Sequence, residues 1–326
     1  MKPKVFVTRL ISGEALTLIE KAAEMRVWEG ELPPGRDVLL SLVREIDGLL
    51  SLLTEKVDAG LMDAAPRLKV ISSMAVGYDN IDVAEATQRG ILVGNTPGVL
   101  TETTADLAFA LLLSAARRTV EGDRWTREGK WKTWGPMVLL GYDVHHATLG
   151  IVGLGRIGAE MAKRARGFDM RVIYHSRTRR PEEELRLGLE WRPDLHSLLA
   201  DSDFVSLHAP YGARTHHMIG QSEFARMKAS AIFVNTSRGS LVDQKALYEA
   251  LRQGRIAGAG LDVTEVEPLP LDDPLLTLDN VVITPHIGSA SHATRTRMAI
   301  MAAENLIAGL QGKRPPNCVN PEALKE

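Results

Sequence analysis

The stretch Leu149-Gly-Ile-Val-Gly-Leu-Gly-Arg-Ile-Gly158 decides the fold of this chain. Its apolar start predicts a β-strand, and the residues after it have helical composition. Between them, Gly153 allows a tight turn, Gly155 lets backbone N–H groups approach a pyrophosphate, and Gly158 lets the helix pack closely on the strand. This context predicts a dinucleotide-binding loop. The contacts expected from the loop come from Gly153, Leu154, Gly155, Arg156, Ile157 and Gly158.

The 326 residues suffice for two cores of about 100 to 200 residues each. Short apolar runs alternate with amphipathic segments on both sides of the loop, which indicates parallel sheets covered by helices on both faces. The expected strands are 5–7, 48–53, 68–71, 91–93, 149–152, 170–174, 204–207, 231–234, 258–261 and 281–283. The expected helices are 13–23, 57–65, 83–88, 101–118, 156–166, 195–199, 223–227, 244–252 and 289–310.

We therefore predict an α/β protein with two doubly wound parallel-sheet domains and a cleft between them. Residues 99–286 form the Rossmann dinucleotide-binding domain. It is inserted into a flavodoxin-like substrate-binding domain, residues 1–98 plus 287–326, because the helical tail is expected to return to the N-terminal domain.

Composition excludes several classes of protein. The net charge is −2 and the basic residues are dispersed, so neither nucleic acid nor a membrane surface is an expected partner. The single cysteine, Cys318, excludes an internal disulfide and fits a reducing compartment. No metal site is expected, since the adjacent pairs His145-His146 and His216-His217 would point opposite ways on a strand. Without a signal-peptide core or a spanning segment, a cytoplasmic location is expected.

Three polar residues follow three predicted strands of the second domain. Arg238 comes after strand 231–234, Glu267 after strand 258–261 and His286 after strand 281–283. Ligands of doubly wound sheets gather beyond the carboxyl ends of the strands. Each residue alone has a structural explanation, but together they predict a carboxylate clamp, an orienting group and a proton donor beside a nucleotide.

Five ordered motifs resemble those of one family. They are Gly153–Gly158, Val234–Val242, Gly260–Pro268, Thr284–Ser289 and, in the first domain, Ala75–Asp82. Together they resemble the D-isomer-specific 2-hydroxyacid dehydrogenases, and within that family most of all the glyoxylate/hydroxypyruvate reductase branch. The resemblance covers essentially the whole chain.

The resemblance implies reduction of a small 2-oxo acid, glyoxylate or hydroxypyruvate, to the D-2-hydroxy acid by hydride from a nicotinamide. Arg238 would hold the substrate carboxylate, helped by the backbone N–H groups of Val76 and Gly77. His286 would donate a proton to the developing alkoxide. Glu267 would hydrogen-bond the imidazole of His286 and favour its cationic form.

Further contacts are expected around this centre. The cofactor contacts beyond the glycine loop are Thr236, Ser237, Arg238, Asp262, His286, Ile287 and Gly288, with Asp262 facing the nicotinamide. Residues 131–136 either form a small satellite core or, as the family implies, an arm that lends Trp134 to the active site of a twofold partner. The second reading predicts a homodimer. Candidate walls of the substrate site are Leu53, Met74, Leu100 and Trp134.

The loop after strand 170–174 bears on the choice of cofactor. NAD sites usually place a carboxylate there for the ribose 2′-hydroxyl, but this chain has His175-Ser-Arg-Thr-Arg-Arg180. Ser176, Arg177 and Thr178 would attract a 2′-phosphate, so NADP(H) is favoured and NAD(H) stays possible.

Two other functions stay open. One is a phosphoglycerate dehydrogenase-like enzyme of the same family. The other is a dinucleotide-sensing binding protein similar to the co-repressors among the relatives of this family. The presence of Arg238, Glu267 and His286 together favours turnover.

Overall fold

The computed structural model describes residues 2–324. The chain divides into two compact units, Met1–Leu100 with Ala290–Glu326 and Thr101–Ser289. Each unit contains one sheet, of five and seven strands respectively, and every paired strand is parallel. The predicted α/β class with two parallel sheets is therefore confirmed.

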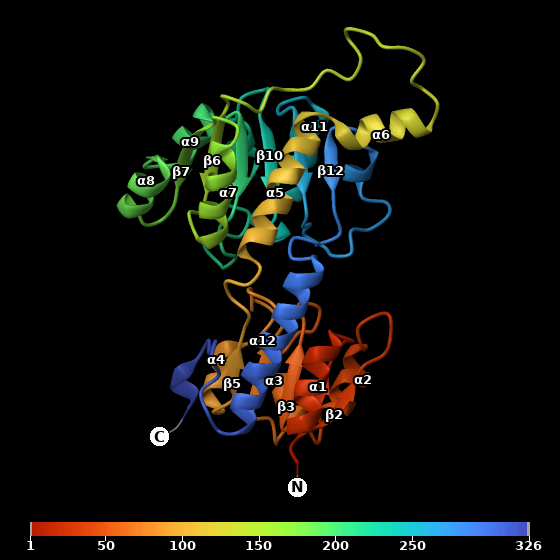
Figure 1. Ribbon diagram of the computed structural model, residues 1–326, viewed down its shortest axis with the longest axis vertical. Helices are drawn as coiled ribbons and strands as arrows, with labels where there is room; N and C mark the ends of the chain where they lie inside the picture. Colours follow the sequence, from red (N-terminus) through yellow and green to blue (C-terminus); the bar gives the residue numbers. More distant parts are fainter. Residues whose placement is uncertain (1, 325–326) are drawn as a thin grey trace. The chain divides into compact units, whose positions relative to one another are not determined.

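The five-stranded sheet has the order β2-β1-β3-β4-β5, the flavodoxin-like order (Figure 1). Its strands are β1 (Lys4–Val7), β2 (Glu24–Val27), β3 (Gly48–Ser51), β4 (Val70–Ser73) and β5 (Leu92–Gly94). Its helices are α1 (Gly13–Ala22), α2 (Arg36–Leu42), α3 (Ala59–Ala64), α4 (Val83–Gln88), α12 (His292–Leu310) and the 3₁₀ turn η3 (Pro321–Ala323). Helices α2, α3 and α4 cover one face, and the core there includes Phe6, Leu49 and Ile71.

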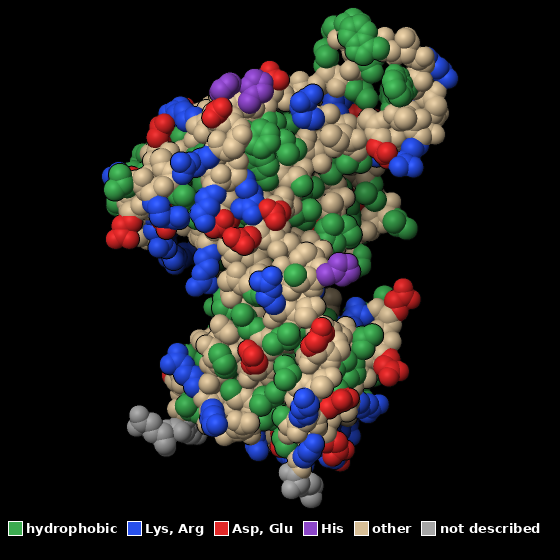
Figure 2. All heavy atoms as spheres, in the orientation of Figure 1, with side chains coloured by type: hydrophobic (Ala, Val, Ile, Leu, Met, Phe, Trp, Pro, Cys, Tyr) green, Lys and Arg blue, Asp and Glu red, His purple; other side chains and the backbone are tan. Residues whose placement is uncertain are grey.

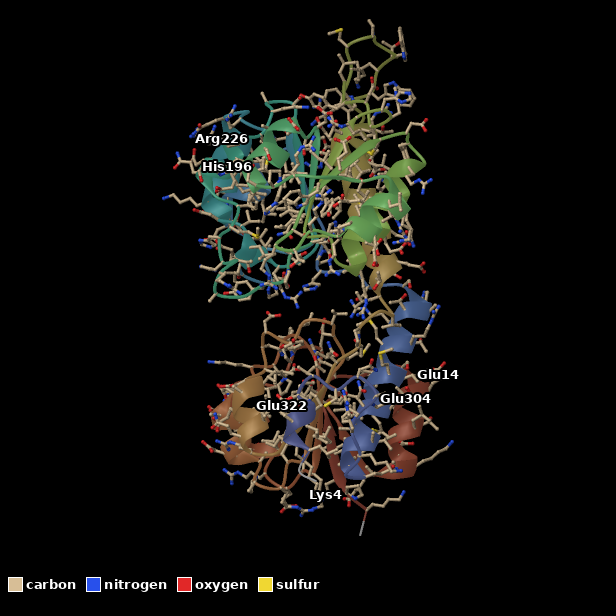
Figure 3. All side chains as sticks on the ribbon, turned by 90° about the vertical axis from the view of Figure 1, so that its left-hand side faces the viewer. Lys4, Glu14, His196, Arg226, Glu304 and Glu322 are labelled. Atoms are coloured by element: carbon tan, nitrogen blue, oxygen red, sulfur yellow. The ribbon has the colours of Figure 1, made fainter. Side chains whose placement is uncertain are left out.

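Helix α12 brings the C-terminal segment back onto this sheet, beside α1. Figure 3 shows the two helices adjacent, with Glu14 on α1 and Glu304 on α12. The approach is close at Gly309, where an added Cβ would lie 2.5 Å from the Val70 side chain. The buried Asn305 amide donates to the Asn95 carbonyl (2.8 Å) and accepts from the Asn317 N–H (2.9 Å). Such fully used buried amides hold one packing arrangement, because any shift would leave polar groups unpaired.

The seven-stranded sheet has the order β12-β11-β10-β9-β6-β7-β8, so the direction of winding reverses between β6 and β9. Its strands are β6 (Thr148–Val152), β7 (Arg171–His175), β8 (Glu190–Trp191), β9 (Phe204–Leu207), β10 (Ile232–Asn235), β11 (Gly258–Leu261) and β12 (Val281–Ile283). Its helices are α5 (Thr101–Ala116), α6 (Thr119–Arg127), α7 (Arg156–Arg166), α8 (Pro181–Leu187), α9 (Leu195–Asp201), α10 (Gln221–Phe224) and α11 (Gln244–Arg252), with 3₁₀ turns η1 (Gly239–Leu241) and η2 (Pro274–Thr277). Helices α5 and α7 pack on one face and α9, α10 and α11 on the other. The reversal between β6 and β9 is where a doubly wound sheet binds its ligand.

Several expected boundaries are wrong. The helix expected over 101–118 ends at Ala116, because Arg118 takes a left-handed backbone (φ 52°) and a second helix, α6, starts after it. The helix expected over 223–227 covers Gln221–Phe224. Five helices and strands of the described chain were not expected: β2, α2, α6, α8 and β8. In the described part of the chain, no helix combines the length and the apolar character that crossing a membrane requires.

Candidate active site

The glycine loop follows β6 and begins helix α7. Gly153 has a φ of +96°, and a Cβ there would lie 2.8 Å from the backbone of His208 and Ala209. A Cβ on Gly158 would lie 2.5 Å from the Gly153 carbonyl oxygen. Gly155, the N-cap of α7, has nothing within 4 Å of the corresponding position. Two glycines are thus required by close packing inside the unit, whereas Gly155 leaves open the space in which phosphate oxygens would meet the helix N-terminus.

Two of the buried polar atoms that have no partner in the described chain follow β9 and β10; others, such as the Ser51 and Ser73 hydroxyls, lie in the five-stranded unit. Thr236 follows β10 and His208 follows β9. The Thr236 Oγ1 and the His208 Nδ1 are both buried, and neither makes a hydrogen bond in the described chain. Unpaired buried polar atoms are rare in native structures, since each costs about 1–3 kcal/mol. A dinucleotide at the winding reversal would supply partners for such atoms, so the residues present fit this cofactor.

His208 is a neutral imidazole. Burial lowers its pKa to about 4, and its Nε2 lies 2.8 Å from the Ser206 Oγ. At neutral pH it therefore offers a donor or an acceptor to a ligand without adding charge. The sequence marked it only weakly, as a polar residue directly after strand 204–207.

Asp262 anchors the turn that carries His286. Its side chain is 1% exposed, and Oδ1 accepts from the Thr284 hydroxyl (2.6 Å) and the Ile287 N–H (2.8 Å), while Oδ2 accepts from the Gly288 N–H (2.7 Å). Its backbone carbonyl accepts from the His286 N–H at 3.0 Å. The backbone N–H groups of Ile287 and Gly288 are therefore bonded to Asp262. A helical neighbour that the sequence did not indicate, Thr104, lies 3.4 Å from where a Gly288 Cβ would stand.

His286 and Glu267 form a pair, with Nδ1 to Oε2 at 2.7 Å. Burial alone would raise the pKa of Glu267, but the hydrogen bond and charge of His286, the Thr264 N–H and Arg238 together lower it below its ordinary value. An ionised Glu267 holds the proton on Nδ1, which leaves Nε2 of His286 as the nitrogen that can exchange a proton with a substrate.

Arg238 is held by its own loop. Asn235 Nδ2 donates to the Arg238 carbonyl (2.9 Å), and Asn235 Oδ1 accepts from the Ser237 N–H (3.0 Å). The Ser237 hydroxyl donates to the Leu207 carbonyl on β9 at 2.9 Å. Arg238 is near enough to Glu267 for its charge to lower the pKa of that carboxyl. The fold thus gathers Arg238, Glu267 and His286 at the carboxyl ends of β10, β11 and β12.

Within residues 2–324, the loop after β7 presents two arginine side chains without a hydrogen bond or ion pair, Arg177 and Arg180. The Ser176 hydroxyl donates to the Thr178 carbonyl (2.7 Å), which closes the loop around Arg177. Arg179 pairs with Glu184 (2.9 and 2.8 Å) and lies over the Trp191 ring, 5.2 Å from its centroid. The exposed Arg177 side chain makes no hydrogen bond or ion pair within residues 2–324.

Val76 and Gly77 belong to the five-stranded unit, in the loop after β4. Asn95 Nδ2 donates to the Val76 carbonyl (2.9 Å), so the loop is tied to the end of β5. Of the candidate walls, Leu53 is partly exposed, whereas Met74 and Leu100 are largely buried.

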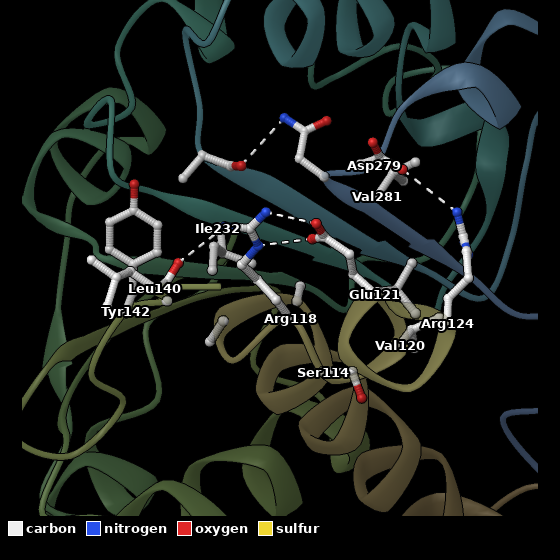
Figure 4. Close-up of a pocket in the computed structure, with 16 residues that line it drawn as sticks. Ser114, Arg118, Val120, Glu121, Arg124, Leu140, Tyr142, Ile232, Asp279 and Val281 are labelled. Carbon is white, nitrogen blue, oxygen red and sulfur yellow. Dashed lines mark hydrogen bonds and ion pairs between the residues drawn. The ribbon is translucent and has the colours of Figure 1, made fainter. Parts of the chain in front are cut away.

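Trp134 is expected either in a small satellite core or at the active site of a partner. It is 79% exposed on an arm that follows α6. Where the arm rejoins the fold, Leu140 and Tyr142 line a pocket of about 220 Å³ together with Ile232 and Val281, the first residues of β10 and β12 (Figure 4). The arm and this pocket therefore lie at the amino ends of the strands, the edge opposite His286.

The adjacent histidines do not point opposite ways, so that expectation is wrong. His146 and His217 have φ values of 61° and 49°, which is not strand geometry. The rings of His216 and His217 stack at 3.9 Å, and those of His145 and His146 meet edge to face at 5.1 Å. Within the described residues, no three His, Cys, Asp or Glu side chains are grouped so that they could hold a metal ion.

A glycine loop at the winding reversal and a proton-exchanging histidine near an arginine are the features of a nicotinamide-dependent dehydrogenase of the two-domain α/β class. The family model described as "D-isomer specific 2-hydroxyacid dehydrogenase, NAD binding domain" matches residues 109–288. The chain belongs to the family of D-isomer-specific 2-hydroxyacid dehydrogenases, oxidoreductases that act on CH–OH donors.

Relatives match the chain over nearly its full length. The glyoxylate reductase of Korarchaeum cryptofilum is 60% identical, over 100% of this chain and 98% of its own, and that of Thermococcus litoralis is 55% identical, over 99% and 98%. Among solved structures, the NADPH-dependent glyoxylate/hydroxypyruvate reductase of Sinorhizobium meliloti, in complex with NADP and malonate, has a TM-score of 0.87. It is 34% identical over 99% of this chain and 98% of its own.

The low pKa of His208 makes stability depend on pH. In the unfolded chain the imidazole has its ordinary pKa of about 6.5 and in the folded chain a pKa of about 4, so stability rises with pH between these values. We expect the stability of the wild type to fall by up to about 3 kcal/mol from pH 7 to pH 4 through this residue. The variant His208→Gln can keep the bond to Ser206. In urea unfolding, its stability should lack the pH dependence between pH 7 and pH 4 that comes from the His208 imidazole. The exposed His145→Gln should retain it, and equal pH slopes in wild type and His208→Gln would contradict the assignment.

Proposed function

We propose that this protein reduces glyoxylate, with hydroxypyruvate as a second substrate, using NADPH. The pairing of His286 with an ionised Glu267 beside Arg238 carries the proposal, because it provides a proton donor next to a carboxylate-binding cation. The names of the relatives from Korarchaeum and Thermococcus support glyoxylate as substrate. A cytoplasmic location is supported by the single cysteine, which fits a reducing compartment.

Each residue of the site has a definite task in this reaction. When bound, the nicotinamide supplies hydride to C2 of the substrate. Arg238 binds the substrate carboxylate and polarises the carbonyl. The backbone N–H groups of Val76 and Gly77, in the loop after β4, are further candidate donors to a substrate. His286 donates the proton on Nε2 to the carbonyl oxygen as negative charge develops there. Glu267 retains the proton on Nδ1 and stabilises the cation that His286 must be before transfer.

His286→Ala tests this mechanism. With NADPH and glyoxylate, followed by the fall in nicotinamide absorbance, we expect kcat to drop by about 10²- to 10⁴-fold, the usual contribution of general acid catalysis. The exposed His145→Ala serves as the control and should keep wild-type rates. Unchanged kcat in His286→Ala would refute the mechanism. Wild-type protein that binds NADPH but reduces no 2-oxo acid would favour a nucleotide-sensing protein instead.

The preference for NADPH is the finer part of the proposal and rests on Arg177. We expect Arg177→Ala to raise KM for NADPH about tenfold, the loss of one charge-assisted contact, and to leave KM for NADH unchanged. Arg180→Ala changes another exposed arginine of the same loop and should have a smaller effect. A wild-type kcat/KM that favours NADH would overturn the preference.

We also propose that the protein is a homodimer in which the arm reaches the partner. Large apolar side chains are exposed along the arm, and Figure 2 shows them gathered on the projection after α6. They are Trp131, Trp134, Met137, Val138 and Leu140. Apolar groups gathered on one exposed segment are typical of an interaction surface.

Light scattering at micromolar concentration should therefore give twice the chain mass of 35.7 kDa. Trp134→Ala should lower kcat/KM for glyoxylate while the dimer persists, because the arm keeps its other apolar contacts. A monomeric wild type would overturn the proposal, and a dimer with unaffected kcat/KM in Trp134→Ala would confine the arm to assembly.

A further inference from the structure

Glu267 lies in an irregular loop between β11 and η2. Within this loop the Thr264 N–H donates to Glu267 Oε1 (3.2 Å) and the Thr264 hydroxyl donates to the Val266 carbonyl (2.8 Å), so residues 264–267 form a closed turn. Because the turn is closed, a shift of Glu265 is passed to Glu267. The position of the carboxylate beside His286 therefore depends on what holds Glu265.

The side chain of His217 holds Glu265. Its Nε2 is hydrogen-bonded to Glu265 Oε1, and the two side chains are 38% and 31% exposed. The backbone N–H of His217 also donates to the Ser240 carbonyl at 2.9 Å. One residue of the loop after β9 thus contacts both the loop that carries Arg238 and the loop that carries Glu267.

The backbone of residues 217–219, which carries the His217 side chain, is bonded to the loop after β10. The Ile219 N–H donates to the Leu241 carbonyl (3.1 Å), and the Asp243 N–H donates to the Ile219 carbonyl (2.9 Å). Ile219 and Val242 form a parallel bridge, as neighbouring strands do. Residues 217–219 therefore move with the loop after β10, and the imidazole is fixed relative to Arg238.

The loop of Glu267 also packs tightly on the loop after β10. A Cβ on Gly239 would lie 1.9 to 2.4 Å from backbone atoms of Thr264 and Glu265. On the outer side, the Glu265 N–H donates to Gln244 Oε1 (3.0 Å), and Gln244 Nε2 donates to Asp273 (2.7 Å). These contacts hold the backbone of the turn, while His217 holds its acidic side chain.

We propose that His217 is a positioning residue for the reaction, acting through Glu265 to keep Glu267 in place beside His286. This role rests on the proposed function. An exposed ion pair adds little to stability, but a displacement of about 1 Å at a reacting group can cost about a hundredfold in rate. The titratable groups that face His217 are Glu265, the His216 ring stacked on it at 3.9 Å, and Tyr211, which meets His216 edge to face at 6.1 Å.

Two substitutions of similar size separate the hydrogen bond from the volume of the side chain. His217→Gln retains a nitrogen donor for Glu265, whereas His217→Leu does not. The left-handed backbone at 217 (φ 49°) disfavours both equally. We expect His217→Leu to lower kcat with glyoxylate about tenfold without changing KM for the cofactor, and His217→Gln to stay within about twofold of wild type.

Two observations together give a readout that a merely structural role would not move. They are a lower kcat at unchanged KM for the cofactor in His217→Leu and the rescue of that kcat by His217→Gln. His196→Leu is the matched control. His196 lies on helix α9 (Figure 3), and its Nε2 pairs with Glu223 at 3.2 Å in another exposed histidine–glutamate pair.

A double-mutant cycle tests the route through Glu265. If His217 acts through Glu265, then His217→Leu combined with Glu265→Leu should lower kcat no more than either change alone. If the double variant lowers kcat by the product of the two single-variant factors, the two residues contribute independently, and the proposed action of His217 through Glu265 is overturned.

Hydrogen exchange provides a measurement that needs no turnover. Amides of residues 264–267 should exchange faster in His217→Leu than in wild type or His217→Gln. Exchange or kcat at the wild-type level in a folded His217→Leu would each overturn the proposal. If the wild type reduces no 2-oxo acid, the proposed function fails, and exchange of this segment still decides whether His217 holds the turn.

Discussion

The buried carboxylate of Asp262 is the constraint on which the site depends. Three donors of the turn that follows β12 converge on its two oxygens, and its own carbonyl fixes the His286 N–H. A buried carboxylate is stable only when its lone pairs are used, so the turn has one arrangement that satisfies it. That arrangement includes the left-handed backbone of His286 (φ 53°), which a free turn would avoid.

The two edges of the seven-stranded sheet differ in the groups that they present: polar groups lie at the carboxyl edge, and the apolar arm leaves from the amino edge. At the carboxyl edge, glycine packing, the neutral His208 and three interlocked loops bring polar groups together around the winding reversal. At the amino edge, the turn at Arg118 ends α5 and starts α6, and Arg118 is bound to Glu121 by two hydrogen bonds of 2.8 and 2.7 Å. The apolar arm leaves from this edge.

Periodicity predicted the buried elements well and the exposed ones poorly. Helices α7 and α11 and strands β9, β11 and β12 have the expected bounds, since an apolar face or run marks each of them. Strand β2 is Glu-Met-Arg-Val at a sheet edge with no buried residue, and α8 buries only Leu187. Such elements are formed by neighbours that they pair with or pack against, and their own residues do not mark them.

The same distinction holds for the site. Glycine spacing and the placement of Arg238, Glu267 and His286 after strands were visible in the sequence, because the carboxyl ends of parallel strands must meet at one edge. The hydrogen bonding of Asp262 to the Ile287 and Gly288 N–H groups was not visible in the sequence. His217 was set aside on the assumption of strand geometry, which its positive φ contradicts.

The sequence by itself determined the fold class, the dinucleotide loop and the family, because backbone freedom at glycine and the period of apolar residues are local properties. Only the tertiary structure decided which polar atoms are already paired. Thr236 and His208 each keep a buried atom without a partner in the described chain, whereas both carboxylate oxygens of Asp262 accept hydrogen bonds. Hydrogen-bond capacity is settled by neighbours distant in sequence, so it appears only when the loops are brought together.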